Sequence, residues 1–191
     1  MATPGSASWH AMLDSAELIL RDEGYGALTS RRVAECINVK QRLVYYYFKT
    51  MDDLIVETFR RLSLRELERL RHALASKAPL RHIWDVCIHT SDTRMISEFM
   101  ALANRNDRLR KEVVRFIEES RAIQVKALRA ALEGKSSVSR IAPAGLAIMA
   151  TSLALSIMRE KALGVNTGHR DVLAAINDFI AAAEPAKRAR T

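Results

Sequence analysis

The stretch "GYGALTSRRVAECINVKQRLVYYYFKTMDDLI", residues 24–55, contains the local signals that predict the first part of the fold. Thr29 can cap a short helix, and Asn38 can make the turn after it because asparagine tolerates a left-handed backbone. A helix of barely two turns is expected over residues 40–48. The "TMDD" that follows predicts a longer helix with Thr50 at its cap and carboxylates in its first turn.

Helical periodicity continues on both sides of this stretch. Apolar residues recur at helical spacing from Trp9 to Leu20, and Gly24 is expected to close this first helix. Further helices are predicted over residues 52–76, 80–90, 93–103, 107–132, 143–163 and 170–183. We find no convincing strand and no repeat, so we expect an all-α fold of about nine helices. The expected parts are a disordered arm (1–8), a three-helix head (9–51), a helical bundle (52–183) and a basic tail (184–191).

The positive charge of the chain is concentrated locally. The 191 residues carry 30 basic and 22 acidic side chains, a formal net charge of +8. Residues 1–60 hold seven basic and eight acidic side chains, yet residues 29–50 hold five basic side chains against Glu35 alone. A basic balance favours an anionic partner or simply solubility. The placement of the charge on the two short helices, rather than the total, is what favours contact with nucleic acid.

Several classes of protein find no support in the sequence. The two cysteines, Cys36 and Cys87, lie inside helix-like patterns and form no disulfide framework, which favours a reducing compartment. No apolar run approaches the roughly 18 residues of a membrane span, and the N-terminus lacks the pattern of a signal peptide. We therefore expect a cytoplasmic chain with no membrane partner. There is no nucleophile elbow, Gly-rich phosphate loop or pair of thiols, so we expect neither an enzyme nor a cofactor.

Residues 24–55 resemble the DNA-binding segment of the TetR family of transcriptional regulators. The matching features are the glycine–aromatic turn, "LTSRRVAE", a valine opening the third helix, "YYYF", and the capped, acidic start of the fourth helix. The resemblance implies a helix-turn-helix head, a larger bundle for ligand binding and dimerisation, and double-stranded operator DNA as a partner. It also implies a homodimer, most simply a repressor, whose two heads lie in successive major grooves of a near-palindromic operator.

The resemblance also implies particular DNA contacts. The start of the second helix and the end of the third would approach phosphates, while the start of the third would meet the bases. The implied DNA-binding residues are Thr29, Ser30, Arg31, Lys40, Gln41, Arg42, Leu43, Tyr45, Tyr46, Tyr47 and Lys49. The alternative is that "VYYYF" only fills a core. Val44 and Phe48 share a side at a spacing of four and are expected to face the core, a side that Tyr45 and Tyr46 cannot both join.

Four positions depart from the family's usual pattern. Asn38 stands where a glycine is usual, Arg42 where a small residue is usual, and Leu43 where a threonine or similar residue is usual. Met51 stands where a lysine often begins the fourth helix, which removes one phosphate-directed charge. Arg42 could read a guanine through two hydrogen bonds and Leu43 could meet a thymine methyl, so we expect an operator that is not generic for the family.

The region after the head is rich in apolar residues, several of them adaptable methionines. Plain core packing explains each of them singly. The resemblance favours a pocket among them for a small apolar effector, oriented by a few polar groups. The expected pocket residues are Trp84, Cys87, His89, Met95, Phe99, Met100, Phe116, Met149 and Leu153.

The last two helices combine small residues with apolar knobs, a pattern that permits close approach of helices. Two such pairs from two chains would form a four-helix interface, as the resemblance also implies. The expected dimer-interface residues are Leu146, Ala150, Leu153, Ile157, Leu173, Ile176, Phe179 and Ile180.

A second candidate site is the stripe of His82, Asp85 and His89, which share one helical face at i, i+3 and i+7. With a carboxylate such as Glu98 they could hold a divalent metal ion. An ordinary polar stripe is the favoured interpretation, so we expect no metal. Two other functions stay open: a metal-responsive regulator, and a helical protein–protein interaction module that does not bind a specific DNA sequence.

Overall fold

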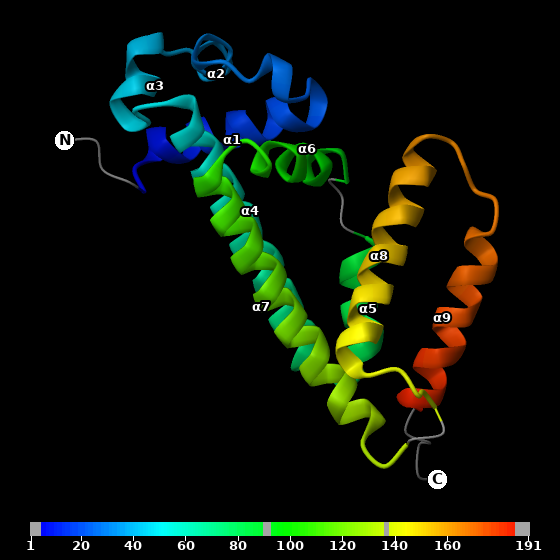
Figure 1. Cartoon of the computed structure of the whole chain (residues 1–191). Helices are drawn as coiled ribbons and strands as arrows, with labels where there is room; N and C mark the ends of the chain where they lie inside the picture. The colour runs from blue at the N-terminus through cyan, green and yellow to red at the C-terminus, as the bar shows by residue number, and fades with distance from the viewer. Residues whose placement is uncertain (1–4, 90–92, 136–137, 186–191) are drawn as a thin grey trace. The chain divides into compact units, whose positions relative to one another are not determined.

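The structure is a computed structural model that describes residues 5–89, 93–135 and 138–185 (Figure 1). These residues form helices joined by turns and contain no strand, which confirms the expected all-α class. The elements within this part of the chain are α1 (Ala7–Asp22), the 3₁₀ turn η1 (Tyr25–Ala27), α2 (Ser30–Cys36), α3 (Gln41–Tyr47), α4 (Met51–Leu74), α5 (Pro79–Ile88), α6 (Thr93–Ala103), α7 (Asp107–Leu132), α8 (Pro143–Ala162) and α9 (His169–Ala183).

The first helix starts earlier than predicted. Ser6 caps α1 by accepting a hydrogen bond from the backbone N–H of Trp9, so residues that we expected in a disordered arm belong to a helix and its cap. Gly24 ends the helix as predicted: its φ of 84° suits glycine, and its N–H donates to the carbonyl of Ile19 at 3.0 Å. Residues 1–4 and 186–191, which make up half of the predicted arm and most of the predicted tail, lie outside the described residues.

The predicted cap of the fourth helix is present. The Oγ1 of Thr50 accepts from the backbone N–H of Asp53 at 3.1 Å, and the carboxylate of Asp53 accepts from the backbone N–H of Thr50 at 2.9 Å. This reciprocal pair satisfies two donors that the first turn of a helix leaves without partners. Arg108 of α7 also pairs with Asp53. Partial burial raises the pKa of Asp53, but the hydrogen bonds from Arg108 and Thr50 outweigh it and hold the pKa below its usual value.

The described chain divides into two compact units. Unit 1 comprises the described parts of Met1–Arg65 and Arg94–Phe116, and unit 2 those of Glu66–Thr93 and Ile117–Thr191. Both α4 and α7 begin in unit 1 and end in unit 2. The boundary therefore differs from the one expected after residue 51, because the first part of α4, all of α6 except Thr93, and the start of α7 share a core with the head.

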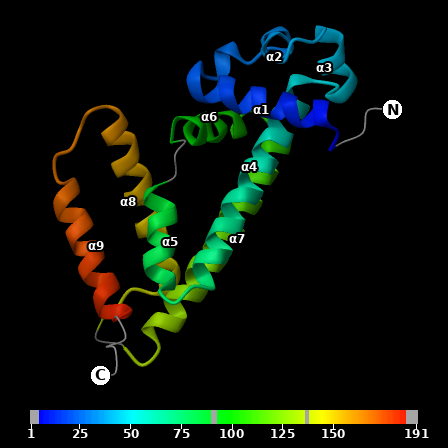
Figure 2. The ribbon, with the colours of Figure 1, turned by 180° about the vertical axis from the view of Figure 1, so that it is seen from behind.

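Unit 1 is built around one apolar core. Buried residues of α1, such as Leu13 and Ile19, pack with Val33 of α2 and Leu54 of α4. The helix α6 lies beside α1 in both views (Figures 1 and 2) and contributes Phe99, whose ring meets that of Phe59 edge-on at 5.1 Å. This packing places α6, from Arg94 onward, in the same compact unit as the head.

A buried carboxylate ties α4 to α1 within unit 1. Glu17 of α1 is almost fully buried, and both of its oxygens accept hydrogen bonds from arginines of α4. Arg61 donates through its Nε at 2.8 Å and Arg65 through a terminal nitrogen at 2.6 Å. A buried charge without such partners would be strongly destabilising, so this cluster fixes how α4 lies against α1.

Contacts at the ends of the helices hold the helices of unit 2 together. Pro79 starts α5 and Pro143 starts α8, at the first helical turn where proline loses no hydrogen bond. Glu184, just after α9, accepts from the backbone N–H groups of Leu80 and Arg81 and so caps α5. Lys135 donates to the carbonyl of Ala183 at the end of α9. Among the described residues, no helix is long and apolar enough to cross a membrane.

Candidate DNA-binding head and interior cavity

The turn between α2 and α3 depends on one left-handed residue. Asn38 has a φ of 52°, as its turn position predicts, and it is the one non-glycine residue with a positive φ in the described part of the chain. Val39 then donates its N–H to the carbonyl of Ala34 at 2.9 Å, which reverses the chain after α2. This geometry brings α3 back against α2, the arrangement of a helix-turn-helix.

Two residues of the aromatic stretch hold α3 to unit 1. Val44 and Phe48 are buried as predicted, and the ring of Phe48 stacks on that of Trp9 with centroids 6.1 Å apart. Leu43 and Tyr47 are half-buried against the same core. The hydroxyl of Tyr47 accepts a hydrogen bond from the Oγ of Ser6 at 3.1 Å. One face of α3 is therefore committed to packing.

The opposite face of α3 is exposed and positive. Tyr45 and Tyr46 are 48% and 53% exposed, so neither joins the side on which Val44 and Phe48 are buried. Lys40, Arg42 and Lys49 are also exposed, and the described residues include no ion-pair partner for any of them. Three uncompensated cations beside two exposed phenols form a surface suited to phosphates and base edges.

The two arginines of α2 differ from the exposed cations of the α3 face, because both have acidic partners. Arg31 pairs with Glu35 at 2.9 Å, and Arg32 makes a two-pronged contact with Glu23. The hydrogen bond from Arg32 lowers the pKa of the Glu23 carboxyl. Both pairs are exposed. Cys36, at the end of α2, is also exposed.

A chain of hydrogen bonds joins α2 to α3 at the centre of the head. The side-chain amide of Gln41 donates to the Oγ of Ser30 at 2.7 Å, and this Oγ donates to the hydroxyl of Tyr45 at 3.0 Å. Ser30 is only 4% exposed, so it is placed to orient its neighbours rather than to meet DNA itself. Thr29 uses its side chain to cap α2 by accepting from the N–H of Arg32. The sequence does not predict these hydrogen bonds, because their partners lie 11 and 15 positions apart and carry no periodic signal.

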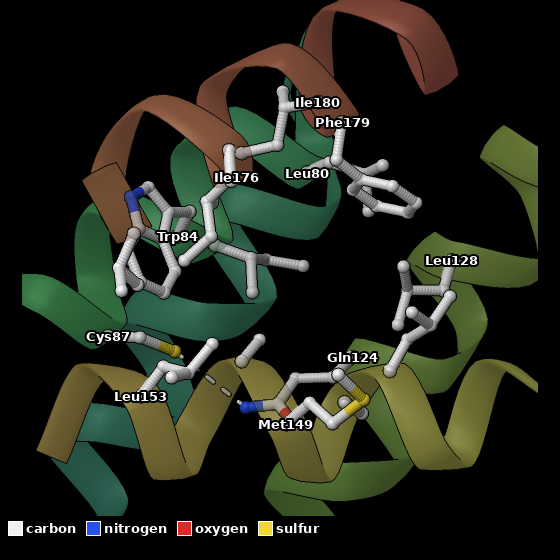
Figure 3. Close-up of a pocket in the computed structure, with 16 residues that line it drawn as sticks. Leu80, Trp84, Cys87, Gln124, Leu128, Met149, Leu153, Ile176, Phe179 and Ile180 are labelled. Atoms are coloured by element: carbon white, nitrogen blue, oxygen red, sulfur yellow. Dashed lines mark hydrogen bonds between the residues drawn. The ribbon is translucent and has the colours of Figure 1, made fainter. Parts of the chain in front are cut away.

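Unit 2 contains a cavity of about 380 Å³ between four of its helices, partly open to solvent (Figure 3). Its walls come from α5, α7, α8 and α9, and nearly all of the side chains are aliphatic or aromatic. The described lining residues are Leu80, Ile83, Trp84, Cys87, Gln124, Leu128, Leu146, Ala147, Met149, Ala150, Leu153, Val172, Ala175, Ile176, Phe179 and Ile180.

One polar group stands in this apolar wall. Gln124 is 7% exposed, and its Nε2 donates to the Sγ of Cys87 at 3.8 Å, the contact drawn as a dashed line in Figure 3. The Oε1 of Gln124 accepts from the hydroxyl of Thr151 at 3.3 Å. Burial raises the pKa of the Cys87 thiol to about 11, with a smaller contribution from Glu66.

Comparison with known proteins identifies the family to which the head is similar. Residues 12–58 match the family described as "Bacterial regulatory proteins, tetR family". The head is a DNA-binding domain of the TetR family. No curated protein matches the chain. The matched family is one of transcriptional regulators, and the match covers the head described above.

Solved structures share the fold of almost the whole chain. A TetR transcription regulator from Haloarcula marismortui has a TM-score of 0.76 at 16% identity, with 92% of this chain and 97% of that chain covered. A protein from Saccharomonospora viridis, crystallised in complex with choline, has a TM-score of 0.78 at 15% identity, with 90% and 94% covered. Unit 2 thus completes a TetR-type fold.

The cavity of unit 2 only partly overlaps the predicted pocket. Trp84, Cys87, Met149 and Leu153 line it. The other predicted pocket residues, His89, Met95, Phe99, Met100 and Phe116, do not. Met95 and Phe99 are buried in the core of unit 1, with Met100 and Phe116 packed against that core, because α6 from Arg94 onward and the start of α7 belong to unit 1. His89 is exposed at the end of α5.

The residues predicted to form a dimer interface point into unit 2. Leu146, Ala150, Leu153, Ile176, Phe179 and Ile180 line the cavity, Leu173 packs against the adjoining core, and Ile157 is buried. The outward face of α8 instead exposes Ile148 and Leu155, one above the other at a spacing of seven. Helical periodicity identified α8 and α9 as apolar but did not show which side each turns inward, because α8 is apolar on nearly every side.

The histidine stripe of α5 makes no metal site within the described residues. His82 and His89 are exposed, and the Nδ1 of His89 lies 3.0 Å from the carbonyl of Asp85 rather than near another ligand. No group of three or more histidine, cysteine, aspartate or glutamate side chains in the described ranges could hold a metal ion.

Proposed function

We propose that the chain is a homodimeric transcriptional repressor that binds a near-palindromic operator and is released from it by a small apolar effector. The observation that carries the proposal is the exposed face of α3. On an identified TetR-type head, this face presents Lys40, Arg42 and Lys49 without acidic partners, beside the hydroxyls of Tyr45 and Tyr46. Such a surface can meet both phosphates and base edges.

The start of α3 is the part proposed to read the sequence. Arg42 is exposed on its first turn and can bind a guanine through two parallel hydrogen bonds. Leu43 is half-buried, which leaves only its outer part for contact with a thymine methyl. Lys40, Tyr45, Tyr46 and Lys49 would contact phosphates and so fix the position of the head without carrying sequence information.

Homodimerisation is proposed through the outward face of α8. Ala144, Ile148, Ser152 and Leu155 are exposed along one side of this helix, and the opposite side is already buried within the chain. A helix that is apolar all round is stable when both sides are covered. A two-fold pairing of these faces would bring small residues against apolar ones and carry two heads.

The cavity of unit 2 is proposed as the effector site. Its apolar lining and moderate volume suit a small apolar molecule, and the choline in the Saccharomonospora viridis structure supports the view that this fold accommodates small ligands. An effector that prefers one spacing of the two heads would shift the population away from the spacing that matches successive major grooves, about 34 Å apart. The helices α4 and α7 contribute to both units and are the elements proposed to couple them.

The test is selection of bound fragments from a pool of random duplex DNA with the purified chain. A near-palindrome of two half-sites is expected, together with a dimer in sedimentation at micromolar concentration. Enrichment without a palindrome, or no enrichment at all, would favour the helical protein–protein module instead. A variant with Lys40, Arg42 and Lys49 all changed to alanine serves as the control and should enrich nothing.

A further inference from the structure

We propose that the cavity of unit 2 binds an uncharged, mainly apolar molecule that carries one hydrogen-bonding group, and that Gln124 receives this group. The description of this molecule as the effector rests on the function proposed above. The inference about its chemistry rests on the lining of the cavity alone.

The lining excludes a charged ligand. Among the described residues that form the walls, none carries an acidic or basic side chain, and Cys87 is the one group that could ionise. Its raised pKa, caused first by burial, keeps the thiol neutral at physiological pH. A carboxylate or an ammonium group in this cavity would lose its hydration without gaining a counter-charge, which is strongly unfavourable.

Gln124 is the polar group that remains incompletely satisfied. Its amide nitrogen has two hydrogens, yet its one partner in the described structure is the Sγ of Cys87, a weak acceptor at 3.8 Å. The Thr151 hydroxyl, which lies 3.3 Å from the Gln124 oxygen, is closer to the carbonyl of Ala147 at 2.9 Å and has only one hydrogen to share. A buried amide paired this poorly costs stability, and a ligand hydroxyl or carbonyl would complete its hydrogen bonds.

The arrangement in Figure 3 fixes where this polar group would lie. Gln124 and Cys87 are joined at one side of the cavity, while Trp84, Ile176 and Phe179 face it from other walls. A bound molecule would therefore turn its polar group toward α7 and its hydrocarbon part toward α5 and α9. Aromatic and branched walls favour such an apolar body by burial of its surface.

The experiment compares three probes that share a ten-carbon chain: 1-decanol, decanoate and decyltrimethylammonium. The chain has two tryptophans, so a Trp9→Phe variant leaves Trp84, in the cavity wall, as the reporter of binding. Fluorescence titration of the full-length chain, without DNA, gives each affinity, and calorimetry checks it. We expect 1-decanol to bind at least about 100-fold more tightly than either charged probe.

Two variants isolate the contribution of the amide. Gln124→Leu, of similar size, should weaken binding of 1-decanol by roughly 2- to 10-fold, because one hydrogen bond is lost. Val114→Leu changes an exposed apolar residue of α7 that does not line the cavity and should leave the affinity within about 2-fold. Tight binding of a charged probe, no binding of 1-decanol, or an unchanged affinity in Gln124→Leu would overturn the proposal.

The same design separates this inference from the proposed function. Probe binding is measured without DNA, so a chain that fails to select an operator can still bind 1-decanol through Gln124. Conversely, if 1-decanol binds as expected but never releases the selected operator, the ligand class stands and the release mechanism is wrong.

Discussion

The single hydroxyl of Ser30 forms hydrogen bonds with two neighbouring side chains and so orients both of them. Its Oγ accepts from the amide of Gln41 and gives its one hydrogen to the oxygen of Tyr45. Tyr45 therefore acts as an acceptor inside the head, and its own hydroxyl hydrogen is left to donate outward. A phosphate oxygen can only accept, so the direction of this chain of hydrogen bonds matches a phosphate beside Tyr45.

This chain predicts a particular pattern of coupling. Ser30→Ala and Tyr45→Phe should each weaken operator binding by roughly 3- to 10-fold, since each removes one link. The double variant should be no weaker than the weaker single variant, as fluorescence anisotropy with the selected operator can measure. Tyr46→Phe lies outside the chain of hydrogen bonds, so its effect should add to that of Ser30→Ala. Additive losses in both pairs would show that Ser30 does not act through Tyr45.

Arg42 on α3 and Lys49 just after it, two of the three exposed cations of this face, are expected to behave differently from each other. Arg42→Ala should cost about 1–3 kcal/mol of binding free energy at the operator and relax the preference at one base pair. Lys49→Ala should weaken binding evenly across sequences and reduce the slope of its salt dependence by about 1, because one phosphate contact is lost. Binding titrations at several salt concentrations on matched and substituted operators measure both effects. If both variants bind like the parent, α3 does not meet DNA with this face.

Among the elements, helix positions were the most predictable part of the fold. The bounds of α4, α6, α7 and α8 agree with the predicted ranges to within two residues at each end. They follow from local signals, such as the cap at Thr50, Pro143 at the start of α8 and the left-handed Asn38. The glycine–aromatic turn is present as η1, although three residues give no helical periodicity.

The lining of the cavity was far less predictable from the sequence. Helical spacing shows that a side chain faces inward but not which helix it meets, so Phe99 was assigned to a pocket although it packs in unit 1. A weak signal for Gln124 did exist. It lies on the inward stripe of α7 that includes Leu109, Val113 and Leu128, where a lone amide stands out.

The cap of α4 predicts how stability depends on pH. The folded-state pKa of Asp53 is lowered, so its contribution is present above the unfolded carboxyl pKa and disappears as the pH falls through the folded value. Asp53→Asn should therefore lower the free energy of unfolding by about 1 kcal/mol at neutral pH. Urea denaturation in progressively acidic buffers should show this difference shrinking. A difference that stays constant in acid would mean that the charge of Asp53 is not what stabilises the cap.

At the scale of the whole molecule, one face of α8 cannot both line the cavity and form a dimer interface. The inward residues of α8 line the cavity with α9, whereas Ile148 and Leu155 face outward and are available to a second copy. The sequence alone could not separate these uses, because the choice depends on how α8 is rotated against α5. The proposed effector site and the proposed dimer interface thus share a helix but not a surface.

A charge on the outward face of α8 should dissociate the dimer. Ile148→Glu is expected to yield a monomer in sedimentation velocity and to weaken operator binding, because a buried glutamate without a partner opposes association. Val114→Glu on α7 is the matched control, since Val114 is 52% exposed and Ile148 is 51% exposed. The control should remain dimeric. A dimeric Ile148→Glu variant would move the interface elsewhere on the chain.

The unequal surroundings of the two cysteines have a practical consequence for spectroscopy. Cys36 is exposed on α2, whereas Cys87 lies in the cavity wall with a pKa of about 11. Thiol-reactive reagents attack the thiolate, so at neutral pH a nitroxide label should attach to Cys36 and spare Cys87. The natural sequence would then place one spin label in each head. Pulsed electron paramagnetic resonance could follow the separation of the heads directly, with and without operator, in a protein that needs no engineered site.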